Sequence, residues 1–371
     1  GGPGGSGTGF GNFGEIGPLD VSLQPRNTTW LSTASLLFID NPVGTGFSYA
    51  ETDDAFTTDV HMIALDLLTT FSTFLTVNTE MQDVPFYIFS ESYGGKMTAA
   101  FSQVLWEAVQ SKKVKCDFRG FAMGDSWISP IDSVYSWGPY LYVNSLVDRT
   151  QLAQLNDTAK KVADLADAGK WKESTAEWGV LEDLVESTTS GVNFYNIQQW
   201  GGEGRSKGLA GPDTTVWERV YQRHVGVYQA PDLNKLMNGP IREKLKIIPA
   251  NVTWGGQSGK VFEFQRADFM KPVIDIVDNL IMKTSLSVVV YSGQLDLIVD
   301  NLGTEAWVYR LSNSDKFRAA KKEPIKIKGI PQAFVKTAGN FQYYWILAAG
   351  HMVPADNGPA GLEMVQQILN K

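Results

Sequence analysis

The chain is poor in the residues that form disulfides and metal sites. Its 371 residues include one cysteine, Cys116, and three histidines. A single cysteine cannot form an intrachain disulfide, and no Cys or His residues are paired at the spacing of metal ligands. We therefore expect no disulfide framework, no bound metal and no cofactor.

Long apolar runs and basic clusters are also missing. No run of about 20 apolar residues occurs, so we expect no transmembrane helix and no membrane partner. The formal net charge is -8 and no basic patch stands out, which argues against a nucleic-acid partner. With 43% hydrophobic residues, the composition is that of an ordinary globular protein of one or two domains.

Having only three histidines shortens the search for a general base. His61 lies in an amphipathic helical pattern and His224 in a polar, aromatic stretch, and both are typical of surface or packing residues. His351 instead follows the strand-like run 341–347 on a loop bounded by Gly350 and Pro354. A histidine held at the carboxyl edge of a sheet is suited to act as the base of a catalytic triad.

A candidate nucleophile, Ser92, lies between a strand-like run and a helix-like stretch. The apolar residues 84–89 precede the pentapeptide Ser90-Glu91-Ser92-Tyr93-Gly94. In a strand-to-helix elbow, the serine hydroxyl projects above the sheet and the next backbone N–H points toward the developing oxyanion. Ser90 replaces the leading glycine of this motif, a small change that the elbow can accommodate.

Asp296 is the best candidate for the third member of a triad. It lies just past the β-branched run 287–291, and Asp300 is the second candidate. A carboxylate here would fix the tautomer of His351 and stabilise its imidazolium form. The order Ser92, Asp296, His351 is that of α/β-hydrolases and differs from the chymotrypsin and subtilisin orders.

Strand-like runs alternate with helical patterns, which predicts an α/β fold with a mostly parallel sheet and helices on both faces. Residues 129–268 lack strand alternation, so we expect a helical cap inserted between core segments 1–128 and 269–371. The expected strands are 35–40, 85–90, 118–124, 286–291 and 341–348, and the clearest helical patterns are 57–77, 93–109 and 150–182.

Four segments together resemble the serine carboxypeptidase family, whose fold is that of α/β-hydrolases with an inserted cap. The four segments occur in the order and spacing of the family and cover nearly the whole chain. Their combination, and not any single motif, excludes a chance match. The segments are 1–4 (GGPG), 38–49 (FIDNPVGTGFSY), 91–95 (ESYGG) and 350–354 (GHMVP).

The resemblance implies an enzyme that removes the carboxyl-terminal residue of peptides through an acyl-enzyme. Ser92 would attack, His351 would transfer the proton and Asp296 would orient His351. The backbone N–H groups of Gly2 and Tyr93 would form the oxyanion hole, where a glycine allows close approach to the tetrahedral intermediate.

The resemblance also implies a site that recognises the free carboxylate of the substrate. It would be formed near Gly1 together with two hydrogen-bonded acids, Glu15 and Glu91. Two neighbouring carboxyl groups cannot both ionise cheaply, so they would share a proton and donate it to the substrate carboxylate. This predicts an acidic optimum for peptide hydrolysis.

Two departures from the family concern the start of the chain and its cysteine content. The chain opens directly on Gly1, so we expect the sheet to lack the amino-terminal strands that the family has. One cysteine favours a reducing compartment, whereas sequons at Asn27, Asn156 and Asn251 favour glycosylation on a secretory route. The family resemblance decides for a lysosomal or secreted protein.

Two other functions stay open at this point. The same triad could serve an esterase or acyltransferase. Alternatively, a truncated relative with Ser90 and Gln294 at motif positions could be catalytically impaired and act as a binding or scaffold protein. The expected partner of the main hypothesis is a peptide or protein carboxyl terminus, and the sequence does not address the oligomeric state.

Overall fold

The core of the molecule is a six-stranded sheet with the strand order β1-β2-β3-β6-β5-β4. The computed structural model describes residues 2–200 and 215–370. Neighbours in the series β1, β2, β3 and β6 are parallel, whereas β5 pairs antiparallel with both β6 and β4. The strands are β1 (Pro85–Glu91), β2 (Asp117–Gly124), β3 (Ser287–Gly293), β4 (Glu323–Ile327), β5 (Ile330–Ala338) and β6 (Phe341–Ile346).

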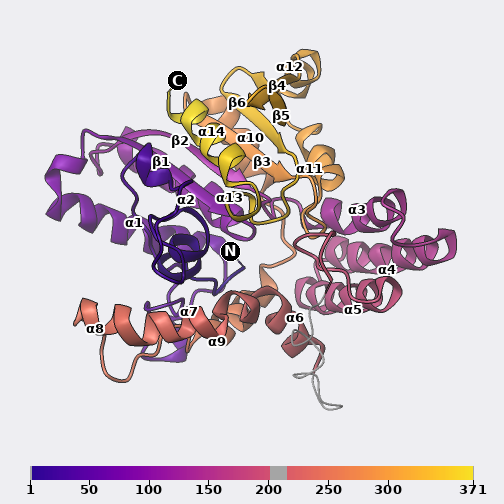
Figure 1. Ribbon diagram of the computed structural model, residues 1–371, viewed down its shortest axis with the longest axis horizontal. Helices are drawn as coiled ribbons and strands as arrows, with labels where there is room; N and C mark the ends of the chain where they lie inside the picture. The colour runs from indigo at the N-terminus through magenta and orange to yellow at the C-terminus, as the bar shows by residue number, and fades with distance from the viewer. Residues whose placement is uncertain (1, 201–214, 371) are drawn as a thin grey trace.

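The strand residues alternate between two hydrophobic layers, because successive side chains point to opposite faces of a sheet. On β3, Val288 and Val290 belong to the larger core cluster, and Val289 and Tyr291 to the smaller one. The larger cluster takes side chains from α1 (Val60–Val77), α2 (Gly94–Gln110) and α10 (Ile274–Lys283), and the smaller one from α13 (Val353–Asp356) and α14 (Gly358–Leu369). Helices therefore cover both faces, as expected (Figure 1).

Among the described helices, α1 is long and apolar enough, by length and composition, to cross a membrane. The mean hydropathy of its 18 residues is 1.5. Its buried side chains, which include Ile63, Phe71 and Leu75, face the core cluster beside α2. The amphipathic packing of a core helix accounts for this composition.

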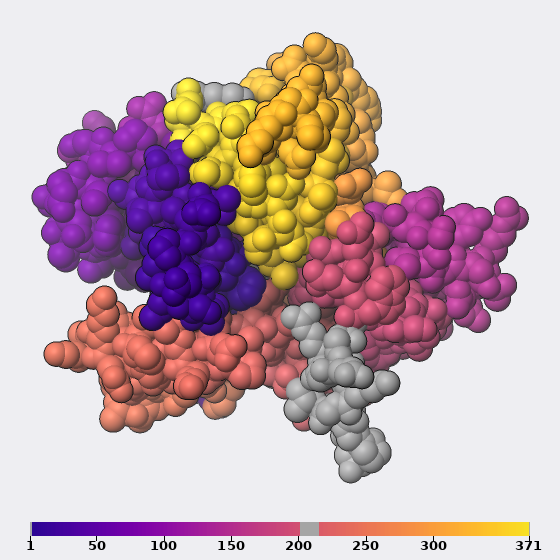
Figure 2. Space-filling view, in the orientation of Figure 1, coloured from indigo at the N-terminus to yellow at the C-terminus, as the bar shows by residue number. Residues whose placement is uncertain are grey.

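The chain between β2 and β3 is helical in its described part. Figure 2 shows these segments, coloured magenta to salmon, along two sides of the core. The helices are α3 (Pro130–Val143), α4 (Arg149–Asp167), α5 (Trp171–Thr189), α6 (Val216–His224), α7 (Pro231–Leu236), α8 (Arg242–Leu245) and α9 (Ser258–Phe264), and α10 follows them. After β3 come α11 (Asn301–Val308) and α12 (Ser314–Ala319).

The helical stretch expected over 150–182 consists of two helices. α4 and α5 form an antiparallel pair, and Gly169 separates them with a φ of +70°. Glycine adopts this left-handed conformation at low cost, and it commonly ends helices in this way. An Asp148–Gln151 capping box fixes the start of α4.

The strand expected over 35–40 is also wrong. This segment has no strand partner, although it runs beside β1. A cleft of about 260 Å³, lined by Leu37 and Ile39 on one side and Phe86 and Ile88 on the other, separates the two. A ladder needs backbones about 4.8 Å apart, so an apolar run alone does not make a strand.

The hairpin of β4 and β5 was not expected from the sequence. In β4, Ile325 and Ile327 alternate with the exposed Lys326, but this period of two extends over only a few residues. Its turn is the pair Lys328 and Gly329, both with positive φ (52° and 83°). These values are those of the two-residue turns that match the twist of a hairpin.

Candidate active site

Ser92 lies at a sharp turn between β1 and α2. Its φ is +63°, a left-handed conformation that is uncommon for any residue with a side chain. The turn is held by backbone bonds: Ser92 N–H donates to the Gly124 carbonyl, and the N–H groups of Gly95 and Trp127 donate to the Ser92 carbonyl, each at 3.0 Å. A Cβ on Gly95 would lie 2.2 Å from the Ser126 side chain, so only glycine fits there.

His351 and Asp296 are brought together although 55 residues separate them in sequence. His351 Nδ1 lies 2.8 Å from Asp296 Oδ2, and both side chains are fully buried. The second carboxylate oxygen, Asp296 Oδ1, accepts the Ile298 N–H at 3.1 Å. The backbone N–H of His351 donates to the Tyr195 carbonyl at 2.7 Å, so the loop that carries His351 is also fixed.

The imidazole nitrogen that faces away from Asp296 is available for chemistry. His351 Nε2 is buried and has no hydrogen-bond partner among the described residues, Ser92 included. Catalytic hydrogen bonds are often long in the absence of substrate and tighten in the complex. Asp300, the second candidate for the acid, does not serve His351: it caps α11, accepting the N–H groups of Leu302 and Gly303.

The expected oxyanion-hole residues lie on two different elements. Tyr93 is the N-cap of α2, where the first backbone N–H groups have no partner within the helix. Gly2 is buried, and a Cβ there would lie 3.0 Å from the His224 carbonyl oxygen. Asp40 holds the loop after Gly2 by accepting the Ser6 hydroxyl at 2.6 Å and the Thr8 N–H at 3.0 Å.

The two expected acids of the carboxylate site are in contact. The carboxyl groups of Glu15 and Glu91 are both buried and line one cleft, and their charges act on each other. Burial raises the pKa of Glu15, and burial and the Glu15 charge raise the pKa of Glu91 well above its ordinary range. Glu15 Oε1 is buried and has no partner among the described residues. Gly1, the third residue expected here, lies outside the described residues.

A buried polar chain connects the helices between β2 and β3 to His351. The Tyr195 ring packs on the His351 ring, with centroids 4.8 Å apart. The Tyr195 hydroxyl lies 2.6 Å from His224 Nδ1, and His224 Nε2 lies 2.6 Å from Glu182 Oε1. His224 is thus a packing residue, as expected, but it packs against the candidate site.

The sequence analysis missed Asp125, a fully buried residue that directly follows β2. Its carboxylate lies close to the two other residues: one side-chain oxygen or nitrogen from each of Asp125, Asp296 and His351 lies within 4.8 Å of the other two. Within this group His351 and Asp296 already bond to each other. Asp125 could have been found from the sequence, because it follows the carboxyl end of a parallel strand, as Ser92 and Asp296 do.

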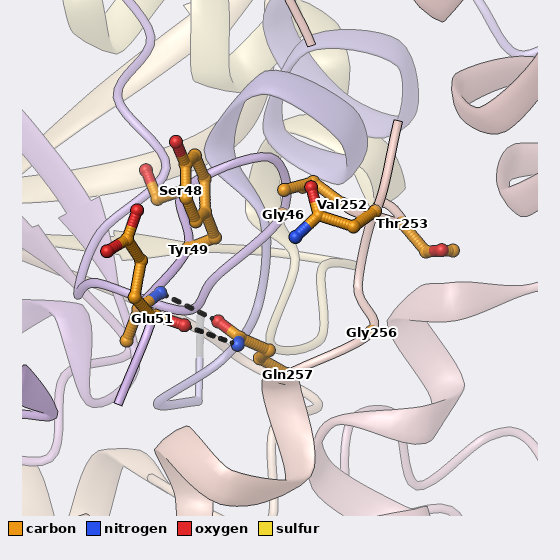
Figure 3. A pocket seen from close by; sticks show the side chains of 10 residues that line it. Gly46, Ser48, Tyr49, Glu51, Val252, Thr253, Gly256 and Gln257 are labelled. Atoms are coloured by element: carbon orange, nitrogen blue, oxygen red, sulfur yellow. Dashed lines mark hydrogen bonds between the residues drawn. The ribbon is translucent and has the colours of Figure 1, made fainter. Parts of the chain in front are cut away.

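A surface cavity of about 440 Å³ does not include any of these residues (Figure 3). Residues 48–51 line one side of it and residues 251–253 another. Gln257 joins its walls, since it accepts the Ala50 N–H at 2.9 Å and donates to the Ala50 carbonyl at 2.8 Å. No buried charged group lines this cavity, so we assign it no role.

Comparisons with known proteins agree with this geometry. A family model described as serine carboxypeptidase matches residues 1–371. The chain belongs to the serine carboxypeptidase family. The retinoid-inducible serine carboxypeptidase of Rattus norvegicus is 51% identical over 99% of this chain and 82% of its own length. The serine carboxypeptidase-like 51 protein of Arabidopsis thaliana is 40% identical over 99% of this chain and 83% of its own length.

The fold agrees with that of a solved member of the same class of enzymes. Kex1Δp, a prohormone-processing carboxypeptidase from Saccharomyces cerevisiae, matches with a TM-score of 0.82 at 20% identity. The match covers 100% of this chain and 81% of that one. The predicted α/β-hydrolase fold is therefore confirmed, and so is the assignment of the chain to a family of serine-type carboxypeptidases.

Four buried carboxyl groups around the site predict that the folded chain is more stable in mild acid than at neutral pH. Burial raises the pKa of Glu15, Glu91 and Asp125, and raises that of Asp300 to about 7. In the unfolded chain the same groups lose their protons near pH 4. Their contribution to stability is therefore complete below the unfolded pKa and is lost as pH rises through the folded pKa.

We expect the midpoint of thermal unfolding to fall by about 5 °C or more between mildly acidic and neutral pH. Calorimetry at constant ionic strength measures this. Asp183 acts in the opposite direction, because Arg219 and Arg223 outweigh its burial and lower its pKa, but it is less buried. The variant Asp300→Asn should flatten the dependence, and a midpoint that rises toward neutral pH would contradict the prediction.

Proposed function

We propose that the chain is a serine carboxypeptidase that removes the carboxyl-terminal residue of peptides and works best at acidic pH. The observations that carry the proposal are the 2.8 Å hydrogen bond between buried His351 and Asp296 and the strained turn at Ser92. Family membership supports the same chemistry. A nucleophile, a base and a group that orients the base are the parts that acyl transfer requires.

In the proposed reaction, Ser92 Oγ attacks the carbonyl carbon of the last peptide bond, and its proton passes to His351 Nε2. Asp296 stabilises the imidazolium that forms, and the N–H groups of Gly2 and Tyr93 stabilise the oxyanion. The C–N bond then breaks, and His351 gives the proton to the leaving amine. Water repeats the sequence on the acyl-enzyme, which releases the shortened peptide and restores Ser92.

We assign recognition of the free carboxylate to Glu15 and Glu91, and also to Gly1, as the family resemblance implies. A pair that keeps one proton can donate it to the substrate carboxylate, whereas a doubly ionised pair would repel the substrate. The raised pKa of both groups supports retention of that proton. Binding should therefore weaken as pH rises through the folded pKa of the pair, and the loss should be seen in KM.

The helices of residues 129–268 are proposed to form a cap over the site. The packing of Tyr195 on His351 and the approach of the His224 carbonyl to Gly2 support this role. These contacts support a position of the cap next to His351 and next to the loop that begins at Gly2. The cap would thereby exclude water and shape the pocket for the peptide.

We also propose that the protein passes through the secretory route to a lysosome or to the outside of the cell. All three sequon residues, Asn27, Asn156 and Asn251, are exposed, which is the condition for an attached glycan. Digestion with an endoglycosidase should lower the apparent mass of the protein from its native source. Substitution of each asparagine by glutamine identifies the site that carries the glycan.

The proposed function is tested with an amino-blocked dipeptide in two forms, one with a free carboxyl group and one with a carboxyl amide. Hydrolysis of both is measured at mildly acidic and at neutral pH. We expect the free carboxyl form to be preferred by at least about tenfold at acidic pH and its KM to rise at neutral pH. Glu91→Gln should reduce this preference, and Glu80→Gln, an exposed acid on the surface, is the matched control.

Three results would redirect the proposal. Equal or better hydrolysis at neutral pH would remove the role of the Glu15 and Glu91 pair. Turnover of esters but not of peptides would select the esterase or acyltransferase. Folded protein that fails to react with a fluorophosphonate, which needs only an activated serine, would select the silent relative.

A further inference from the structure

Asp125 lies beside the triad acid, at the end of the strand next to β3. It is fully buried, and its φ is +39°, a strained value for a residue with a side chain. Its Oδ1 accepts the Gly293 N–H at 2.8 Å, which fixes the carboxyl group toward the loop that carries Asp296. The strained backbone and the bond to Gly293 indicate that Asp125 serves the loop that carries Asp296.

The other oxygen, Asp125 Oδ2, has no donor among the described residues and no access to water. A buried carboxylate oxygen without a donor is costly, whereas a protonated oxygen can itself donate. A carboxylate oxygen of Asp296 lies within 4.8 Å of one of Asp125. Burial and the Asp296 charge raise the pKa of Asp125 well above its ordinary range.

The two acids differ in what else they bind, and this decides which of them holds the proton. Both oxygens of Asp296 accept hydrogen bonds, from His351 Nδ1 and from the Ile298 N–H. Asp125 accepts one, from Gly293. The arrangement therefore favours charge on Asp296 and a proton on Asp125.

We propose that Asp125 is a positioning residue whose protonated Oδ2 donates a hydrogen bond to Asp296 and thereby aims this carboxylate at His351. We further propose that loss of this proton limits kcat as pH rises. The inference rests on the proposed function, since it assigns Asp296 and His351 to acyl transfer. The Asp125 proton is not consumed in the reaction: it stays between the two acids throughout the cycle.

Ionisation of Asp125 would affect the triad in two ways. Two adjacent carboxylates would repel each other, which moves Asp296 away from His351. Loss of the donated hydrogen bond would also leave the Asp296 carboxylate less firmly held against His351 Nδ1. Both effects lower kcat, whereas the Glu15 and Glu91 pair is expected to act on KM.

Other titratable groups around Asp125 belong to each element that packs against it. Glu91 from the end of β1 adds negative charge and so favours the protonated form. The remaining groups that face Asp125 or its partner are Tyr140 of α3, Tyr291 of β3, Asp300 before α11 and Tyr343 of β6. The experiment must therefore distinguish the loss of the Asp125 proton from the loss of a proton by Glu91 or Asp300.

The decisive variant is Asp125→Asn. Its amide nitrogen can donate to Asp296 at every pH, and its oxygen can still accept the Gly293 N–H. Asp125→Ala removes the donor, and Asp300→Asn is the matched control, since Asp300 is an equally buried acid that follows the neighbouring strand β3 but caps α11. The rate of labelling by a fluorophosphonate is measured against pH for each variant, together with kcat and KM on the free-carboxyl dipeptide. The probe forms an Oγ–P bond on Ser92, loses fluoride and passes the serine proton to His351.

We expect Asp125→Asn to keep labelling and kcat within about threefold of the unsubstituted chain in acid, and to lose the decline toward neutral pH. Asp125→Ala should lose about tenfold or more at every pH, which corresponds to one lost hydrogen bond to a charged group. Asp300→Asn should keep the decline. Circular dichroism identifies a variant that does not fold, and if the alanine variant fails to fold the asparagine variant still decides.

The proposal is overturned if folded Asp125→Asn keeps the decline of the labelling rate, or if it is as impaired as Asp125→Ala. It is also overturned if Asp300→Asn removes the decline. Because labelling needs no peptide, the result holds even if peptide hydrolysis fails. Folded protein that is not labelled at all would remove the proposed function and this inference together.

Discussion

Ser92→Ala is expected to lower kcat/KM for peptide hydrolysis by at least about 10⁴-fold, because the acyl-enzyme cannot form without the hydroxyl. The fold should be unaffected, since the turn is held by backbone hydrogen bonds of Ser92 and not by its side chain. Steady-state kinetics measures the loss, and mass spectrometry after fluorophosphonate treatment shows whether the modified site disappears. Ser102→Ala is the matched control: Ser102 is buried on α2, and its hydroxyl has no partner among the described residues.

His351→Ala should produce a loss of similar size, and the double variant with Ser92→Ala should be little worse than either single one. Members of a catalytic triad act as a unit, so their effects do not add. Losses that multiplied in the double variant would mean that the two residues act independently. Retention of peptide hydrolysis by Ser92→Ala would place the nucleophile elsewhere.

The candidate site was largely accessible from the sequence because each of its parts follows a strand. Ser92 comes directly after β1, and Asp296 and His351 follow the ends of β3 and β6 within a few residues; neighbouring parallel strands end at the same edge of the sheet. An apolar run followed by a reactive side chain is a local pattern. The chain order of the three side chains then distinguishes this arrangement from other triads.

The parts that the sequence did not predict depend on contacts between distant residues. Residues 35–40 have the apolar pattern of a strand, but a strand needs a partner, and a cleft separates them from β1. Tyr195, His224 and Glu182 reach His351 through helices whose packing no local pattern fixes. The role of Asp125 follows only once its missing donor and the neighbouring Asp296 are both known.

Lys96→Met is expected to lower the free energy of unfolding by about 3–5 kcal/mol, although methionine matches lysine in length. Lys96 is fully buried on α2, and its Nζ lies 2.8 Å from Asp268 Oδ2, which also accepts the Tyr93 hydroxyl at 2.7 Å. Removal of the ammonium leaves Asp268 charged and buried with one neutral donor in place of an ion pair. Denaturant unfolding at constant pH measures the change.

A surface ion pair provides the matched control for this prediction. Lys115 Nζ lies 2.7 Å from Asp83, but the two side chains are 64% and 75% exposed, so Lys115→Met should cost less than about 1 kcal/mol. The double variant Lys96→Met with Asp268→Asn should recover part of the loss, because no charge is then left unpaired. If Lys96→Met lowered the free energy of unfolding no more than Lys115→Met does, the buried pair would contribute no stability. Apolar packing alone would then hold α2 against the segment before α10. Recovery in the double variant would instead show that the cost of the single change is the unpaired charge, and that the pair fixes the segment between α9 and α10 beside Tyr93.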